Sequence, residues 1–429
     1  MSSLSIFPVE VLENVTSMIT TVDQVHLWQC GNRVLSIKLK KGGLKVTSLK
    51  WTSSSWMPWP RLYFATFACI QQVEWCPATG TSFCPALEIN LLPKTLLSLQ
   101  INCGDIYHLL RIQNANMNEL LPLLRTLDIT GTDIEEENMK HLPQNLITLS
   151  MASVGSSLTS GNLFRDLPST LEVLKLDFIV TDTEEHGNDL PNGLKEFTIS
   201  GVEASYDWLT KLPHSLTTLS MSTRSTFDWS RLPPLLTELE IPCETGFMTS
   251  MIPQLPQSLK TLKVWFDSPI TDDDIALLPK TLVSLRCSSK VTHAGLQQLP
   301  VSVTCLNVDV SATHPDILSF YNPDSRYIRL KSGPCLRDLK LFPLPIKLDF
   351  FEIDFINDDI CALLPAGLRY FTVREGLITP KGASKFPKSI VDFEAYFGVF
   401  DNNETIAYLS YIPKLRLMAN DKAKAQASS

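Results

Sequence analysis

The sequence predicts an α/β solenoid in which short repeats stack on one another. Each repeat gives one strand to a parallel sheet on the concave face, and a short helix or 3₁₀ turn to the convex face. Three observations predict this fold: an aliphatic pattern that recurs at nearly constant spacing, a Leu-Pro dipeptide shortly before most copies of it, and helix-capping signals ahead of that dipeptide.

The aliphatic pattern is leucine, two residues, leucine, one residue and an aliphatic residue, and it recurs about every 23 residues. Clear copies begin at Leu96, Leu124, Leu146, Leu171, Leu194, Leu216, Leu236, Leu259, Leu282, Val303, Leu348, Leu368 and Ile390. Weaker copies are Val46-Leu49-Trp51, Ile70-Val73-Trp75 and Ile412-Leu415-Leu417. Because Val303 and Leu348 are two periods apart, we expect a degenerate unit near Ser325 that uses Ile328 and Leu330. The competing register is Leu336-Leu339-Leu341. The count is then about seventeen units.

The Leu-Pro dipeptide, as in Leu142-Pro143 and Leu278-Pro279, usually stands three residues before the first leucine. Proline stops the preceding turn and starts an extended segment, because it fixes φ and lacks an N–H. Before the dipeptide, Thr271 with Asp274 and Thr132 with Glu135 have the spacing of a capping box. Each unit is therefore predicted to run from strand through loop and short convex helix to Leu-Pro.

One such unit cannot fold alone. Three buried aliphatic side chains contribute roughly 5–9 kcal/mol, whereas ordering some 20 residues costs more than about 20 kcal/mol. Over residues 41–418 the units resemble leucine-rich repeats. They lack the regular asparagine that follows the strand in that family, so we expect the capped convex helix to hold the turn instead.

Residues 1–40 are predicted to form a helical segment. Pro8 suits a first helical turn, and Leu12, Val15 and Ile19 recur at steps of three or four residues. Asp23 is placed to cap a second helix containing Leu27. The segment resembles an F-box, from Phe7-Pro8 to Asp23-Gln24, although Gln24 replaces the expected leucine and Val34 the frequent tryptophan. The resemblance implies an adaptor-binding surface made of Pro8, Leu12, Val15, Ile19 and Leu27.

An F-box followed by leucine-rich repeats implies the substrate-recognition subunit of an SCF-type, cullin-RING ubiquitin ligase. The first element would bind the Skp-type adaptor and cullin complex, and the repeats would bind a protein substrate. The alternative is a scaffold with no ligase role, in which residues 1–40 only cap the solenoid. An enzyme with an unrecognised site is a third hypothesis. We find no catalytic motif, expect no enzymatic activity, and predict no cofactor and no metal.

The composition of the chain limits the classes of partner that we expect it to bind. With 37 basic and 45 acidic residues the net charge is −8, so the overall field favours neither nucleic acid nor an anionic membrane. No secretory signal or long apolar run is found, which predicts a cytoplasmic or nuclear protein. The ten cysteines are scattered singly and are interpreted mainly as small buried hydrophobes. Asp272-Asp273-Asp274 is read as helix capping rather than a cation site, and residues 419–429 as a disordered tail.

A candidate substrate-binding surface comes from the residue between the second and third core positions, which should face the concave side because strand side chains alternate. Along the chain this column is mixed and then turns basic: Lys263, Arg286, Asn307 and Arg329, with Lys260 and Arg326 on the same strands. One interpretation is a solvated face whose charges fell this way by chance. The sharper one is a cradle for an acidic or phosphorylated segment, in which arginine offers two-point contacts.

Overall fold

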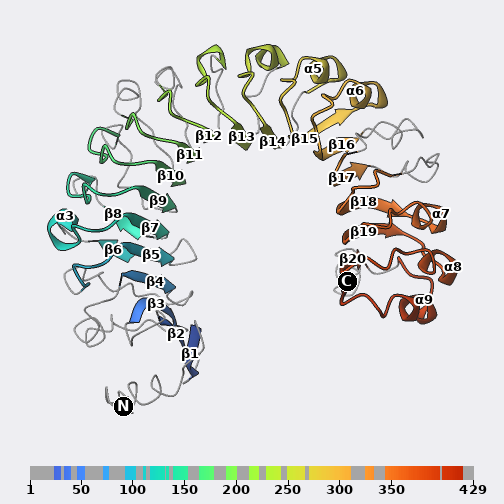
Figure 1. Ribbon diagram of the computed structural model, residues 1–429, viewed down its shortest axis with the longest axis horizontal. Helices are drawn as coiled ribbons and strands as arrows, with labels where there is room; N and C mark the ends of the chain where they lie inside the picture. The colour runs from blue at the N-terminus through green and yellow to red at the C-terminus, as the bar shows by residue number, and fades with distance from the viewer. Residues whose placement is uncertain are drawn as a thin grey trace, which may run out of the picture. The chain divides into compact units, whose positions relative to one another are not determined.

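The computed structural model describes residues 24–29, 33–39, 46–53, 71–76, 92–102, 110–112, 116–130, 132–134, 139–152, 164–177, 190–200, 212–221, 229–242, 249–265, 270–310, 324–332, 344–396 and 399–418. The chain divides into two compact units, Met1–Leu216 and Thr217–Ser429. Both are α/β stacks of the leucine-rich-repeat class, with strands along one side and turns or short helices along the other (Figure 1).

The first unit contains a sheet whose pairing changes along the chain. Strands β1 (Gln24–Gln29), β2 (Arg33–Leu39) and β3 (Val46–Ser53) pair antiparallel in sequence order. From β3 onward all pairs are parallel, through β4 (Gln72–Cys76), β5 (Ser98–Asn102), β7 (Thr126–Thr130), β9 (Thr148–Ala152), β10 (Val173–Asp177) and β11 (Glu196–Ser200). Helix α3 (Met117–Leu120) and the small parallel sheet of β6 (Leu110–Ile112) and β8 (Thr132–Ile134) lie beside this sheet.

The second unit is a run of parallel strands with convex turns between them. The strands are β12 (Thr218–Met221), β13 (Glu238–Pro242), β14 (Thr261–Trp265), β15 (Ser284–Val291), β16 (Cys305–Val310), β17 (Tyr327–Ser332), β18 (Phe350–Ile356), β19 (Tyr370–Gly376), β20 (Asp392–Tyr396) and β21 (Lys414–Met418). The helical turns are η5 (Trp229–Arg231), η6 (Thr249–Gln254), α5 (Asp272–Ala276), α6 (His293–Gln297), α7 (Asp358–Cys361), α8 (Pro380–Ala383) and α9 (Asn403–Tyr408).

The repeat pattern sets the strand register. Equivalent core positions of neighbouring units pair directly, as Leu149 with Leu174 and Leu262 with Leu285, and these side chains are buried. The degenerate unit is confirmed, because β17 pairs in parallel with β16 and β18 and Ile328 is fully buried. The competing register at 336–341 lies outside the described residues. In the three units after β17, phenylalanine occupies the core position equivalent to Ile328. The rings of Phe351, Phe371 and Phe393 stack face to face there.

The Leu-Pro dipeptides start tight turns, whereas the sequence predicted an extended segment directly after the proline; the strand begins a few residues later, as β9 does at Thr148 after Pro143. In most described units the proline carbonyl accepts a hydrogen bond from the N–H of the first core leucine, for example Pro143 from Leu146 at 3.1 Å. The turn also carries a hydroxyl in many units, which lies within hydrogen-bonding distance of two carbonyl oxygens of the preceding unit. Thr281 Oγ1, for example, is 2.6 Å from the Gln257 oxygen and 2.9 Å from the Leu259 oxygen. Thr170, Ser215, Ser258 and Ser302 repeat this contact.

The predicted capping at Thr271 is confirmed. Asp274, which is buried, accepts hydrogen bonds from the Thr271 N–H at 2.7 Å and hydroxyl at 2.6 Å. Asp272 instead accepts from the N–H of Thr292, the residue before α6, at 2.8 Å. These aspartates therefore hold convex turns, in keeping with the capping interpretation. The corresponding prediction at Thr132 is wrong, because Thr132 belongs to strand β8.

The N-terminal prediction needs a correction. Leu27 lies in strand β1, and residues 33–39 form its antiparallel partner β2, so no second helix follows Asp23. Val25 and Leu27 alternate with His26 at the two-residue period of a strand, and this pattern was misread as part of a helix. Pro8, Leu12, Val15 and Ile19 lie outside the described residues. Residues 419–429, the predicted disordered tail, also lie outside the described residues.

Candidate protein-binding surface

The predicted basic column is a true row across neighbouring strands. Lys263 on β14 pairs in register with Arg286 on β15, Arg286 with Asn307 on β16, and Asn307 with Arg329 on β17. Because β-strand side chains alternate and the residue before each of the four is a buried core position, all four side chains face away from the core. The sequence therefore placed these residues correctly. We call this row the basic ladder: Lys263, Arg286, Asn307 and Arg329.

Lys260 and Arg326 are not part of the ladder. Each is the residue immediately before its strand, and each is exposed. Their carbonyls instead hold the next turn: that of Lys260 accepts from the N–H groups of Val283 and Ser284 at 2.7 and 2.9 Å. The sequence placed Lys260 and Arg326 on the same strands as the ladder, whereas each precedes its strand and lies outside the row.

Acidic residues close the ladder at both ends, and sequence reasoning gave them no role. Glu240 on β13 pairs in register with Lys263, and its Oε2 lies 3.0 Å from Lys263 Nζ. Glu352 on β18 pairs in register with Arg329, and its Oε2 lies 2.9 Å from Arg329 Nε. Continuing the column by one period beyond Arg329 reaches Glu352, so the signal was present in the sequence.

The two arginines of the ladder lie close enough to influence each other. Partial burial lowers the pKa of Arg286, and the charge of Arg329 lowers it further, while Tyr327, Glu240 and Glu352 act in the opposite sense. Two guanidinium groups with one neutral asparagine between them therefore repel each other on this surface. A negatively charged group placed between them would remove part of that repulsion.

An aromatic pair borders the ladder. Tyr327 and Phe350 stand two residues before Arg329 and Glu352 on the same strands, and so face the same side. Their rings stack with centroids 4.3 Å apart and planes 10° from parallel. Burial raises the pKa of the Tyr327 hydroxyl, while the charge of Arg329 opposes the shift. This part of the surface therefore joins a flat apolar wall to a row of cations.

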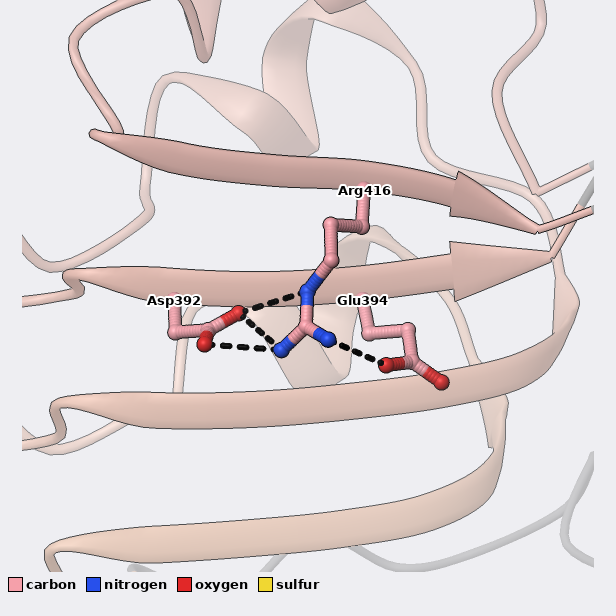
Figure 2. Close-up of polar contacts among 3 residues, drawn as sticks. All are labelled: Asp392, Glu394 and Arg416. Atoms are coloured by element: carbon pink, nitrogen blue, oxygen red, sulfur yellow. Dashed lines mark hydrogen bonds and ion pairs between the residues drawn. The ribbon is translucent and has the colours of Figure 1, made fainter. Parts of the chain in front are cut away.

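Beyond Glu352 the same column continues through Thr372 on β19, Glu394 on β20 and Arg416 on β21. Figure 2 shows Arg416 reaching back across β20, where it makes two-point contact with Asp392 and lies near Glu394. The acidic groups here are paired with arginine, so the basic character is confined to β14–β17.

Other kinds of site find no support in the described part of the chain. No group of three or more His, Cys, Asp or Glu side chains there could hold a metal ion. No helix there is long and apolar enough to cross a membrane. Cys287 and Cys361 are buried, and burial raises the pKa of the Cys361 thiol well above its ordinary value, as is typical of a structural cysteine. The sequence also suggests that Trp51, Trp56, Trp59 and Trp75 form either a ligand platform or a seal at the end of the solenoid core, and their side chains lie outside those that the structure describes.

Comparisons with known proteins identify no family for this chain. No protein-family model matches it, and no curated protein does. Among solved structures, CroV588, described as a novel circular leucine-rich-repeat protein, is similar at 16% identity and a TM-score of 0.46 over 87% of this chain. The functional domain of InlJ from Listeria monocytogenes matches at 15% identity and 0.40 over 86% of this chain and 71% of that chain. An internalin, InlF from Listeria monocytogenes, matches at 11% and 0.34 over 86% of both chains. The chain spans 60% of the length of CroV588.

Proposed function

We propose that this protein is an interaction scaffold whose basic ladder binds an acidic or phosphorylated segment of a partner protein. The observation that carries the proposal is the exact pairing of Lys263, Arg286, Asn307 and Arg329 on four neighbouring strands. Neighbouring strands are about 4.8 Å apart, so the row extends over about 14 Å. An extended segment lying across the strands could therefore present two or three anionic groups to it.

The chemistry of the row favours a protein anion. Arginine binds carboxylate and phosphate through two parallel N–H···O contacts, and asparagine adds both a donor and an acceptor. The flanking Glu240 and Glu352 limit the row to a short stretch, whereas a nucleic acid backbone is best met by a longer basic track. The adjoining Tyr327–Phe350 stack offers an apolar contact to a neighbouring side chain of the partner.

The test uses fluorescently labelled Gly-Ser peptides of equal length that carry four phosphoserines, eight glutamates or no acidic residue. We expect the two anionic peptides to bind at physiological salt and the neutral peptide not to bind. Arg286→Glu should weaken binding roughly tenfold or more. Lys175→Glu is the matched control, because Lys175 occupies the same column on β10 in the first unit. Equal binding by wild type and Arg286→Glu overturns the proposal, as does tighter binding of a labelled single-stranded RNA through the same residues.

In its fuller form the proposal makes the scaffold the substrate-recognition subunit of an SCF-type ubiquitin ligase. Its support is the resemblance of residues 7–24 to an F-box and the order of that segment before the repeats. The partners would be a Skp-type adaptor, the cullin complex and the anionic substrate segment, in the cytoplasm or nucleus.

One observation favours the alternative for part of this segment, a solenoid cap with no ligase role. The antiparallel strands β1 and β2 extend the sheet beyond β3 and so cover an edge of the first parallel strands, as a cap does. The two functions separate in a pull-down with the Skp-type adaptor. Under the ligase proposal, Leu12→Asp with Val15→Asp abolishes adaptor capture while the repeats still unfold cooperatively. If the double variant captures the adaptor as well as wild type does, or if wild type captures none, the segment acts only as a solenoid cap.

A further inference from the structure

Glu352 combines two features that rarely occur together. It stands in the solvent-facing column of β18, next to the basic ladder, yet it is only 6% exposed. A buried carboxylate is costly unless opposite charges compensate it. Its two oxygens are compensated separately: Oε2 lies 2.9 Å from Nε of Arg329, and Oε1 lies 3.6 Å from Nη2 of Arg374.

The contact with Arg329 is close but not directed. Nε of Arg329 is within ion-pair distance of Glu352, but the pair lacks the geometry of a hydrogen bond. The attraction to Glu352 is therefore mainly electrostatic, and the other described contact that positions Arg329 is a side-chain hydrogen bond with Tyr327. Two-point hydrogen bonding to a carboxylate, of the kind seen between Arg416 and Asp392, is not among the described contacts of Arg329. Arg329 can turn toward another anion at smaller cost than a two-point contact would impose.

Arg374 supplies the compensation that such a movement needs. It lies on β19, diagonally across from Glu352, and also lies 3.7 Å from Asp354. If Arg329 leaves Glu352, Arg374 still neutralises the buried carboxylate. Without Arg374, Arg329 would be the one cation within ion-pair distance of Glu352 in the part of the chain that the structure describes, with only the more distant charge of Arg286 to compensate the buried carboxylate once Arg329 is withdrawn.

We infer that Glu352 is a built-in competitor for Arg329, and that this competition makes the ladder select phosphorylated segments over segments that are only acidic. The inference rests on the proposed function. A partner carboxylate that displaces Glu352 exchanges one singly charged group for another and gains little. A phosphate carries a charge of about −1.5 to −2 and three acceptor oxygens, so it outcompetes the internal carboxylate.

The experiment measures the affinities of the phosphoserine and glutamate peptides, which carry about the same total charge. Wild type should bind the phosphoserine peptide more tightly. Glu352→Gln removes the competitor, so glutamate-peptide binding should tighten by roughly three- to tenfold and the preference should shrink. Glu394→Gln is the matched control, because Glu394 lies in the same column on β20 with Arg416 beside it, and it should leave the preference unchanged.

Arg374→Gln tests the same inference in the opposite direction. It leaves Glu352 dependent on Arg329, so phosphoserine-peptide affinity should fall severalfold although Arg374 lies outside the ladder. An unchanged preference in Glu352→Gln overturns the inference while the proposed function stands. If Glu352→Gln does not fold, unchanged phosphopeptide affinity in Arg374→Gln overturns it. Failure of both anionic peptides to bind wild type removes the proposed function itself.

Discussion

Asp358 in helix α7 accepts hydrogen bonds from both the backbone N–H and the hydroxyl of Thr379, at 2.9 and 2.6 Å. Thr379 is the residue before helix α8, and its hydroxyl in turn accepts from the N–H of Lys381. One carboxylate therefore orients the cap of the next convex turn. Asp272 and Thr292 have the same relationship between α5 and α6. In these units the carboxylate therefore connects one convex turn to the next.

The link predicts a coupling between Asp358 and Gly382. A Cβ on Gly382 would lie 2.2 Å from Oδ1 of Asp358, so Gly382→Ala pushes the carboxylate off Thr379. We expect Gly382→Ala and Asp358→Ala each to cost about 2 kcal/mol of unfolding free energy. Together they should cost less than the sum, because alanine suits a helix once the carboxylate is gone.

Chemical denaturation of the full chain measures these values. Gly367→Ala is the control, since the nearest atom to its Cβ would be 3.5 Å away, an ordinary contact, and it should be close to neutral. Strictly additive costs for Asp358→Ala and Gly382→Ala would show that the two positions do not interact.

Gly376 is predicted to tolerate no side chain. Its φ is +126°, and a Cβ would lie 2.0 Å from the carbonyl oxygen of Ile356, with which it pairs in register. The clash is with backbone, which cannot move aside without breaking the pairing of β18 and β19. Gly376→Ala should therefore cost about 3 kcal/mol, more than Gly382→Ala. A midpoint of denaturation equal to that of Gly367→Ala would contradict this.

The hydroxyl of the turns should contribute a small stabilisation at each step. Thr281→Val keeps the shape and removes the donor that reaches the carbonyls of Gln257 and Leu259. One lost hydrogen bond to a partly solvated carbonyl costs about 1 kcal/mol. Leu235 stands at the equivalent turn position of another unit with no hydroxyl, so Leu235→Thr should raise stability or leave it unchanged. A Thr281→Val variant as stable as wild type would show that water replaces this contact.

Sequence reasoning worked where one period repeats. Spacing alone located β17 around the poorly matching Ile328, because a strand that missed the register would leave its neighbours uncovered. It also aligned the four residues of the ladder. The prediction failed at Leu27, because a short apolar run fits a helix and a strand equally well. The pairing of β1 with β2 selects the strand there.

Other features needed three-dimensional contacts. The position of Glu352 follows from the period, but its burial and its ion pair with Arg374 on β19 are contained in no spacing rule. The hydroxyl turns, by contrast, are visible as Leu-Pro followed by one residue and then Ser or Thr, as in Leu278-Pro279-Lys280-Thr281. The Asp358–Thr379 link is less visible, because Thr379 reads as an ordinary cap for its own helix.

An ion pair between neighbouring turns predicts a measurable titration. The hydrogen bond and charge of Lys347 lower the pKa of Asp324 below its ordinary 3.8. A carboxyl with a depressed folded-state pKa favours folding above its unfolded pKa, and that contribution is lost as the pH falls through the lower folded value. In Lys347→Met the Asp324 carboxyl should titrate closer to 3.8, as followed by carbon NMR. Lys280→Met, in another turn, should leave it unchanged.

Arg416 is predicted to hold the last described strand, β21, against β20. Its Nη2 lies 2.8 and 2.7 Å from the two oxygens of Asp392, its Nε lies 3.2 Å from Oδ1, and its Nη1 lies 3.5 Å from Glu394 (Figure 2). These contacts raise the pKa of Arg416, chiefly through the hydrogen bonds to Asp392. Leu417 and Met418 on the same strand are exposed, so they contribute little burial, and the clamp carries a larger share of the attachment.

Arg416→Lys keeps the charge but loses the two-point geometry, so the amides of β21 should exchange with deuterium about two- to fivefold faster. The amides of β13, far from this contact in the sequence, should exchange at their wild-type rates. Lys414→Gln is the control, since it removes a cation from the same strand without touching the clamp. High salt should reduce the difference between wild type and Arg416→Lys, because the Arg416 side chain is 54% exposed and ions screen its charge. Identical exchange in wild type and Arg416→Lys would assign the attachment of β21 to its backbone hydrogen bonds alone.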